Sequence, residues 1–178
     1  MATLYTIGHS TRTLDELVEA LHAHSIKTLV DIRAFPMSRR LPHFNRESLE
    51  KSLPEAGIRY VWMQELGGRR KKSLAESPNL ALRNESFRNY ADYMLTDEFQ
   101  DGVKNLLDVA RQQRTAIMCA EGLFWRCHRR LVSDSLVANG VTVQHIMPSG
   151  ELRPHKLTNG AVIEGQRVTY PGERSLFT

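Results

Sequence analysis

The sequence predicts an α/β fold: a single domain built on a mostly parallel, twisted sheet of about five strands flanked by helices, with a small C-terminal hairpin or tail. Three observations favour this class. Short runs rich in β-branched residues alternate with segments whose apolar residues recur at helical spacing. Residues 115–119 are almost wholly apolar, as is typical of a parallel strand covered on both faces. The length of 178 residues suits one domain with a full core and leaves little room for two.

Five short segments predict the strands of the sheet, because each is rich in β-branched, aromatic or apolar residues and stops at a turn or at polar residues. These segments are residues 3–7, 28–32, 58–62, 115–119 and 141–146. After Pro148, residues 161–163 and 168–170 predict a hairpin around Gly165. We expect residues 1–147 to form the core domain and residues 148–178 to form a C-terminal extension packed on it.

Capping residues predict where the helices begin and end. Thr13 opens a capping box and is followed by leucines at helical spacing. Asn45 is expected to cap a second, short helix, and Ser86 and Thr96 are expected to begin two helices in tandem. The Asn-Gly pair at 139–140 ends the last helix.

The composition excludes several classes of protein. With 41% hydrophobic and 25% charged residues, no repeat and no low-complexity segment, the chain is neither disordered, collagen-like nor a solenoid. The net charge of +4 suits a phosphate-bearing partner without requiring one. No signal-like N-terminus and no apolar run near the ~18 residues of a membrane span is present, so we expect a cytoplasmic protein with no membrane partner.

Unusual polar residues collect where the predicted strands end. Since ligands of parallel sheets bind outside the carboxyl ends of the strands, we expect these residues to share one site. They are His9 and Ser10 after the first strand, Arg33 and Ser38 after the second, Gly67, Gly68 and Arg69 after the third, and Cys119 and Glu121 after the fourth. Arg126, His128 and Arg129 follow Cys119 closely in the sequence, and Asp31 precedes Arg33 by two residues; these four are further candidate binding residues.

Cys119 is the most informative of these residues, because it lies where a buried strand gives way to a turn and then a helix. Helix amides and the nearby Arg126 and Arg129 would stabilise a thiolate there. The arrangement resembles the Cys-loop-Arg cradle of rhodanese-like enzymes and cysteine phosphatases, which makes Cys119 a candidate nucleophile. The alternative is a buried, inert cysteine, since free cysteines are often buried.

Glu121 and His9 are the other candidate catalytic residues. Glu121 is a candidate general acid or base, with an ion pair to Arg33 or Arg129 as the alternative. His9 follows the first strand and would titrate near neutrality, unless it only ties two loops together. Cys127 is expected to pack on the face of the last helix. Metal-ligand pairs such as CxxC are missing, so we predict no metal site, and the sequence points to no particular cofactor.

The arginines at 33, 69, 126 and 129 form a candidate set for binding phosphate or carboxylate. Arg69 opens a basic run, residues 69–72, inside a long stretch without periodicity. That run either faces solvent or touches a nucleic-acid backbone. Phe124 and Trp125 either stack on a base or pack under the helix.

Five motifs in order make the chain similar to a known family. They are residues 6–10, then Asp31, Arg33, Pro36, Ser38, Pro42 and Phe44, then residues 66–69, then Tyr90, Ala91, Tyr93 and Met94, and finally residues 119–121 with 127–129. Together they resemble the bacterial and archaeal family called domain of unknown function 488. The resemblance covers nearly all of the predicted core and implies the same α/β fold and the same polar residues. Some members carry a DNA-repair label, which implies a nucleic-acid substrate.

Three functional hypotheses follow. The first is an enzyme acting on a phosphate-bearing substrate, a nucleotide or a nucleic acid, at the carboxyl edge of the sheet. The second is a non-catalytic binding or regulatory module that uses the same pocket. The third is rhodanese-like thiol or sulfur-transfer chemistry, which requires an exposed Cys119 with a lowered pKa. A homodimer is the oligomeric state to test first, because two-fold dimers are the commonest assemblies.

Overall fold

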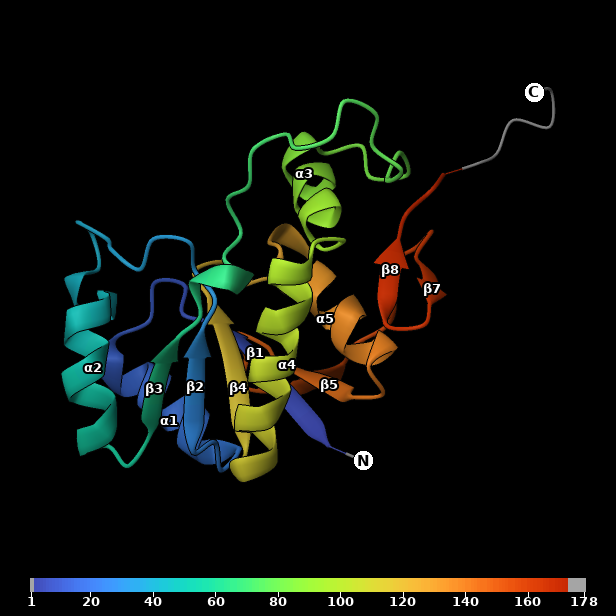
Figure 1. Ribbon diagram of the computed structural model, residues 1–178. Helices are drawn as coiled ribbons and strands as arrows, with labels where there is room; N and C mark the ends of the chain where they lie inside the picture. Colours follow the sequence, from blue (N-terminus) through green and yellow to red (C-terminus); the bar gives the residue numbers. More distant parts are fainter. Residues whose placement is uncertain (1, 173–178) are drawn as a thin grey trace, which may run out of the picture.

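The computed structural model describes residues 2–172 (Figure 1). Its helices are α1 (Leu14–Ala23), α2 (Arg46–Glu55), α3 (Glu85–Tyr93), α4 (Asp97–Gln112) and α5 (Arg129–Ala138), with short 3-10 turns η1 (Pro42–Phe44), η2 (Gln64–Leu66) and η3 (Phe124–Arg126). Its strands are β1 (Thr3–Gly8), β2 (Thr28–Asp31), β3 (Arg59–Trp62), β4 (Thr115–Cys119), β5 (Thr142–Ile146), β6 (Leu152–Pro154), β7 (Val162–Glu164) and β8 (Arg167–Thr169). None of the helices in this part of the chain is long and apolar enough to cross a membrane.

The main sheet has the strand order β3-β2-β4-β1-β5-β6, and β7 pairs with β8 in a separate hairpin. Strands β1 to β5 run parallel to their neighbours, whereas β6 is antiparallel to β5. The predicted α/β class, the parallel strands and the small hairpin are therefore confirmed. The sequence analysis missed β6, because this edge strand has three exposed residues and no alternation of apolar and polar side chains.

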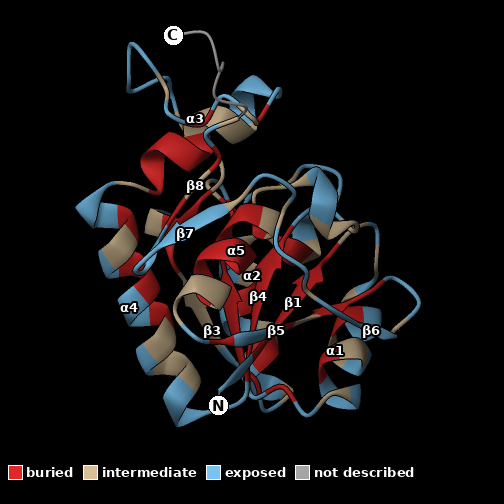
Figure 2. Cartoon of the chain, turned by 90° about the vertical axis from the view of Figure 1, so that its right-hand side faces the viewer, coloured by how far each residue is buried: buried red, intermediate tan, exposed pale blue. Residues whose placement is uncertain are grey.

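Helices cover both faces of the sheet (Figure 1). Ile7 of β1 and Met118 of β4 join the apolar core under α1 and α2. Leu4 and Ile117 join the larger core under α3, α4 and α5. Successive residues of one strand thus point into different cores, which explains why the central strands are apolar throughout. Figure 2 shows these strands as the buried centre of the molecule.

The helix caps agree with the sequence in part. The side chain of Thr13 accepts the amide of Glu16 at 3.1 Å in a full capping box, and Thr96 caps α4 as predicted. Ser86 does not cap α3: it lies inside the helix, and Asn84 takes that position. Asn45 precedes α2 as expected, but its side chain accepts a hydrogen bond from the amide of Ser38. It therefore makes no capping hydrogen bond with the amides of α2.

The register of the parallel strands brings the predicted site residues together. Gly8 at the end of β1 pairs with Cys119 at the end of β4. Asp31 at the end of β2 pairs with Met118 on the other side of β4. The carboxyl ends of β1, β2 and β4 therefore lie side by side at one edge of the sheet.

Candidate functional site

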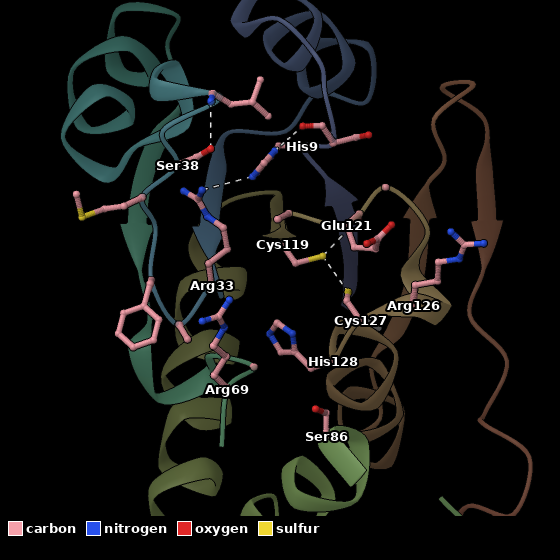
Figure 3. Close-up of a pocket in the computed structure, with 18 of the residues that line it drawn as sticks. His9, Arg33, Ser38, Arg69, Ser86, Cys119, Glu121, Arg126, Cys127 and His128 are labelled. Atoms are coloured by element: carbon pink, nitrogen blue, oxygen red, sulfur yellow. Dashed lines mark hydrogen bonds between the residues drawn. The ribbon is translucent and has the colours of Figure 1, made fainter. Parts of the chain in front are cut away.

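A cavity of about 1220 Å³ opens at this edge of the sheet (Figure 3). The predicted residues that line it are His9, Ser10, Arg33, Ser38, Gly68, Arg69, Cys119, Glu121, Arg126 and His128. Asp31, Gly67 and Arg129 do not line it and lie next to residues that do. Figure 3 shows Arg33 and Arg69 on one side, Glu121 and Arg126 on the other, and the two cysteines between them.

The loops after β1 and β4 are joined backbone to backbone. The amide of His9 donates to the carbonyl of Cys119 at 3.0 Å, and the amide of Ser10 donates to that of Ala120 at 2.9 Å. Gly8 permits this approach, because a Cβ added there would lie 1.7 Å from the carbonyl oxygen of Glu121. The cavity wall around Cys119 and Glu121 thus depends on a glycine one residue before His9.

A Gly8→Ala variant is expected to unfold at a markedly lower temperature, since the neighbour of the new methyl group is backbone and cannot rotate away. Gly122→Ala is a matched control, because the atoms nearest its Cβ belong to the side chains of Ser10 at 3.3 Å and Pro148 at 3.8 Å. Thermal unfolding measures both changes. Equal melting temperatures for the two variants would contradict the close approach of the loops.

Arg33 is held by other residues of the protein. Its Nε and Nη2 contact the two carboxylate oxygens of Asp31 at 2.9 and 2.6 Å, and Nη2 also donates to the carbonyl of Phe44. The hydroxyl of Tyr60 donates to the same carboxylate at 2.6 Å. The charge of Arg33 is therefore matched by Asp31, and its main effect is to fix the loop after β2.

His9 is a neutral, buried side chain between these elements. Its Nδ1 lies 2.8 Å from the carbonyl oxygen of Ser10, and its ring stacks on Phe44. Burial lowers its pKa to about 4, so it does not titrate near neutrality. With the proton on Nδ1, the lone pair of Nε2 faces Nη1 of Arg33 at 3.4 Å.

His128 and the two glycines after η2 pack the floor of the site. His128 Nε2 lies 2.8 Å from the carbonyl oxygen of Ile32, and burial lowers the pKa of the imidazole to about 4. A Cβ on Gly68 would lie 2.4 Å from Nδ1 of His128, and one on Gly67 would lie 2.8 Å from Cα of Ala34. The glycines therefore allow two loops to pack closely.

The two cysteines are in direct contact. Their Sγ atoms are 2.9 Å apart, and Cys119 is only 2% exposed. Burial and the neighbouring sulfur raise the pKa of Cys119 well above its usual value. Burial opposes ionisation of Cys127 as well, but the hydrogen bond with Cys119 and the charge and amide of Arg129 outweigh it and lower the pKa to about 7.

Cys127 lines the candidate site, although the sequence analysis assigned it to helix packing. The structure places it between η3 and α5, ahead of the helix, where its Sγ accepts the amide of Arg129 at 3.4 Å. It lines the cavity and is more exposed than Cys119. Its position just before a helix N-terminus and two residues before an arginine was the signal that could have identified it.

Arg129 is 1% exposed and lies beneath the cavity wall. It donates to the carbonyls of Glu121 and Gly122 at 3.0 and 3.3 Å and to the hydroxyl of Thr6 at 3.1 Å. Among the described residues it forms no ion pair with a carboxylate, and its Nε has no partner. A buried cation of this kind favours an anion beside it, and the thiolate of Cys127 supplies one.

A buried chain of hydrogen bonds continues from Arg129 to the C-terminal hairpin. Thr6 contacts His145 at 2.5 Å, His145 contacts His155 at 2.8 Å, and His155 contacts Asp134 at 2.7 Å. Asp134 also accepts the hydroxyl of Tyr170 at 2.6 Å. Burial lowers the pKa of His145 to about 2, so it links its neighbours as a neutral ring.

Stability is expected to fall between pH 6.5 and pH 4. The pKa values of His9, His128 and His145 in the folded state lie below the ordinary value of 6.5, so the unfolded chain binds more protons across this window. At pH 5 each histidine would lower the free energy of unfolding by up to about 2 kcal/mol relative to pH 7. Urea unfolding at both pH values checks this, and a flat profile would contradict it.

Three exposed arginines face the cavity without a carboxylate partner. They are Arg40, Arg69 and Arg126, and none forms an ion pair among residues 2–172. Glu121 is the carboxylate among the lining residues. Arg40 was not singled out in the sequence analysis, since it comes seven residues after Arg33 and is not one of the motif residues of that loop. The described residues contain no group of three or more His, Cys, Asp or Glu placed to hold a metal ion.

Comparison with known proteins gives one match. A family model described as "Domain of unknown function DUF488" matches residues 13–136. No curated protein and no solved structure matches the chain.

Proposed function

Because the chain belongs to the DUF488 family, whose description assigns no activity, we propose from the site alone that the protein is an enzyme acting on a phosphate-bearing ligand of nucleotide size. The observation that carries this proposal is the set of Arg40, Arg69 and Arg126, three unmatched cations around a cavity with one lining carboxylate. Guanidinium groups bind phosphate oxygens in pairs of parallel hydrogen bonds, so an anion with several oxygens fits this set best.

Large apolar side chains beside the arginines favour a ligand with a ring. Phe35 and Met37 line the same cavity and are 66% and 79% exposed, which is unusual for residues of this size. The guanidinium of Arg69 lies 5.9 Å from the ring of Phe35. Aromatic and arginine side chains together stack on nucleobases, which favours a nucleotide or a single-stranded nucleic acid over free phosphate.

Cys127 supplies the nucleophile in this proposal. Its lowered pKa keeps a large fraction of thiolate at neutral pH, and its Sγ faces the cavity (Figure 3). Cys119 stays protonated and supports the thiolate from 2.9 Å. Glu121 is an exposed carboxylate on the same wall and is the candidate for proton transfer to the leaving group.

Ligand binding tests the proposal. Pyrophosphate, mononucleotides and short single-stranded DNA and RNA are screened by thermal shift, and the best ligand is then titrated calorimetrically. Arg69→Ala and Arg40→Ala are each expected to weaken binding about tenfold to a hundredfold, since a hydrogen bond to a charged group contributes about 1.5–3 kcal/mol. Arg59→Ala removes the same charge at the opposite end of the sheet and is expected to change nothing.

The variants also separate an enzyme from a binding module. Cys127→Ser is expected to keep the affinity for the ligand and to lose turnover. If Arg59→Ala weakened binding as much as Arg69→Ala, or if no phosphate-bearing probe bound, the proposal would be wrong.

A further inference from the structure

We propose that Cys119 and Cys127 form a redox-active dithiol, in which Cys127 attacks a small-molecule disulfide and Cys119 resolves the product into an internal disulfide. This step does not depend on the proposed function. It requires two thiols in contact, access from the cavity to one of them, and a difference between them that sets the order of events. The structure supplies all three.

The contact comes from elements that hold the two sulfurs from opposite sides. Cys119 is the last residue of β4, and Cys127 lies just before α5. Their Sγ atoms are 2.9 Å apart, so a shift of under ~1 Å brings them to bonding distance. Figure 3 shows both sulfurs at the centre of the cavity wall, directed at each other.

The order of events follows from exposure and hydrogen bonding. Cys127 is the more exposed thiol and accepts the amide of Arg129, which favours its thiolate. Cys119 is 2% exposed, and its Sγ lies 2.9 Å from Sγ of Cys127, to which its thiol can donate. Cys127 therefore reacts first, and Cys119 is shielded until a sulfur beside it becomes a target.

The chemistry balances with a disulfide RSSR as the oxidant. The Cys127 thiolate attacks one sulfur of RSSR, the S–S bond of RSSR breaks, and RS⁻ leaves with the electron pair. Cys119 then attacks Sγ of Cys127 and releases the second RS group, which takes the Cys119 proton and leaves as RSH. The two cysteines lose two electrons, and RSSR gains them as two thiols.

The cavity favours anionic disulfides, since Arg40, Arg69 and Arg126 surround it. Oxidation would occupy the sulfur that the proposed function uses as its nucleophile. The pair would then switch that activity off reversibly, and a dithiol reductant would restore it. This consequence rests on the proposed function, whereas the exchange itself does not.

The test uses the anionic disulfide 5,5′-dithiobis(2-nitrobenzoate), added in equimolar amount to the fully reduced protein. The wild type is expected to release both thionitrobenzoate groups and to end two hydrogens lighter, with no adduct. Cys119→Ser is expected to release one group and to keep the other as a stable adduct on Cys127. Cys127→Ser is expected to react at least tenfold more slowly at pH 7, because the remaining thiol is buried.

Several outcomes would refute the proposed dithiol. A wild-type protein that keeps a thionitrobenzoate adduct would show that Cys119 does not resolve it. Equal reaction rates for Cys119→Ser and Cys127→Ser would show that Cys127 does not react first. A pyrophosphate titration of the same samples keeps the two proposals apart. Normal pyrophosphate binding without disulfide formation would refute only the dithiol, and disulfide formation without binding of any phosphate-bearing probe would refute only the proposed function.

Discussion

Replacing Arg129 by Met is expected to raise the pKa of Cys127 from about 7 by at least one unit. The guanidinium is the buried cation nearest in sequence to this thiol, and no carboxylate pairs with it among the described residues. Without it, burial again disfavours the thiolate. The rate of alkylation by iodoacetamide at pH 7 should then fall at least about fivefold, since only the thiolate reacts. The rate is measured against pH in a Cys119→Ser background, which leaves one thiol.

Two companion variants make this result specific. Arg129→Lys keeps the charge and is expected to shift the midpoint of the curve of alkylation rate against pH, which is the pKa of Cys127, less than Arg129→Met does. Arg130→Met removes the neighbouring guanidinium, which lies 5.1 Å from the ring of Phe87, and is expected to leave the midpoint unchanged. An unchanged midpoint in Arg129→Met would show that the thiolate has another source of stabilisation.

Replacing Asp134 by Ala is expected to produce the largest loss of stability, about 3–5 kcal/mol. Asp134 is fully buried and accepts hydrogen bonds from His155, Tyr170 and the amide of Thr158. Alanine would leave three donors buried without an acceptor. It would also detach the residues around Tyr170, which belongs to the core beside α5. Chemical unfolding monitored by circular dichroism measures the change.

Graded variants test the cause of that loss. Asp134→Asn keeps the volume and one acceptor oxygen and is expected to cost less than alanine. Tyr170→Phe removes one donor and is expected to cost about 1–2 kcal/mol. Asp108→Ala breaks only an exposed ion pair with Arg111 and is expected to cost under about 1 kcal/mol. A loss in Asp134→Ala no larger than in Asp108→Ala would contradict the buried network.

Local signals explain why much of the fold was predictable. The apolar run of β4 and the capping box at Thr13 are each encoded within a few residues, and the structure has both. The rule that parallel strands end at one edge predicts one shared site for His9, Arg33 and Cys119, and all three line one cavity. Sequence reasoning succeeded here because periodicity and topology depend little on side-chain detail.

The roles of the site residues were less predictable, because they depend on contacts between distant segments. The position of Arg33 after β2 suggested a cation free to bind an anion, yet its guanidinium is paired with the carboxylate of Asp31. Cys127 has helical spacing to Leu131, yet the helix begins only at Arg129 and leaves the thiol facing Cys119. Neither the Asp31–Arg33 geometry nor the approach of the two sulfurs can be computed from spacing along the chain.

The buried residue Arg129 connects Cys127 at the cavity to the hydrogen-bond network that ends at Asp134. On the cavity side it stabilises the thiolate of Cys127, and on the other side it begins the chain that ends at Asp134. Asp134 and Cys127 thus lie at the two ends of a network that runs through neutral side chains. The carbonyls of Glu121 and Gly122 and the hydroxyl of Thr6 accept hydrogen bonds from the buried guanidinium, which has no direct carboxylate partner among the described residues.

Protection of Cys127 from alkylation tests whether the phosphate-bearing ligand and the thiol share the cavity. The Cys119→Ser variant is treated with iodoacetamide at pH 7, with and without a saturating amount of the phosphate-bearing ligand found by thermal shift. We expect the bound ligand to slow alkylation of Cys127 at least tenfold, and Arg69→Ala to abolish the protection at the same ligand concentration. Alkylation at an unchanged rate with the ligand bound would mean that the ligand and the thiol do not share the cavity.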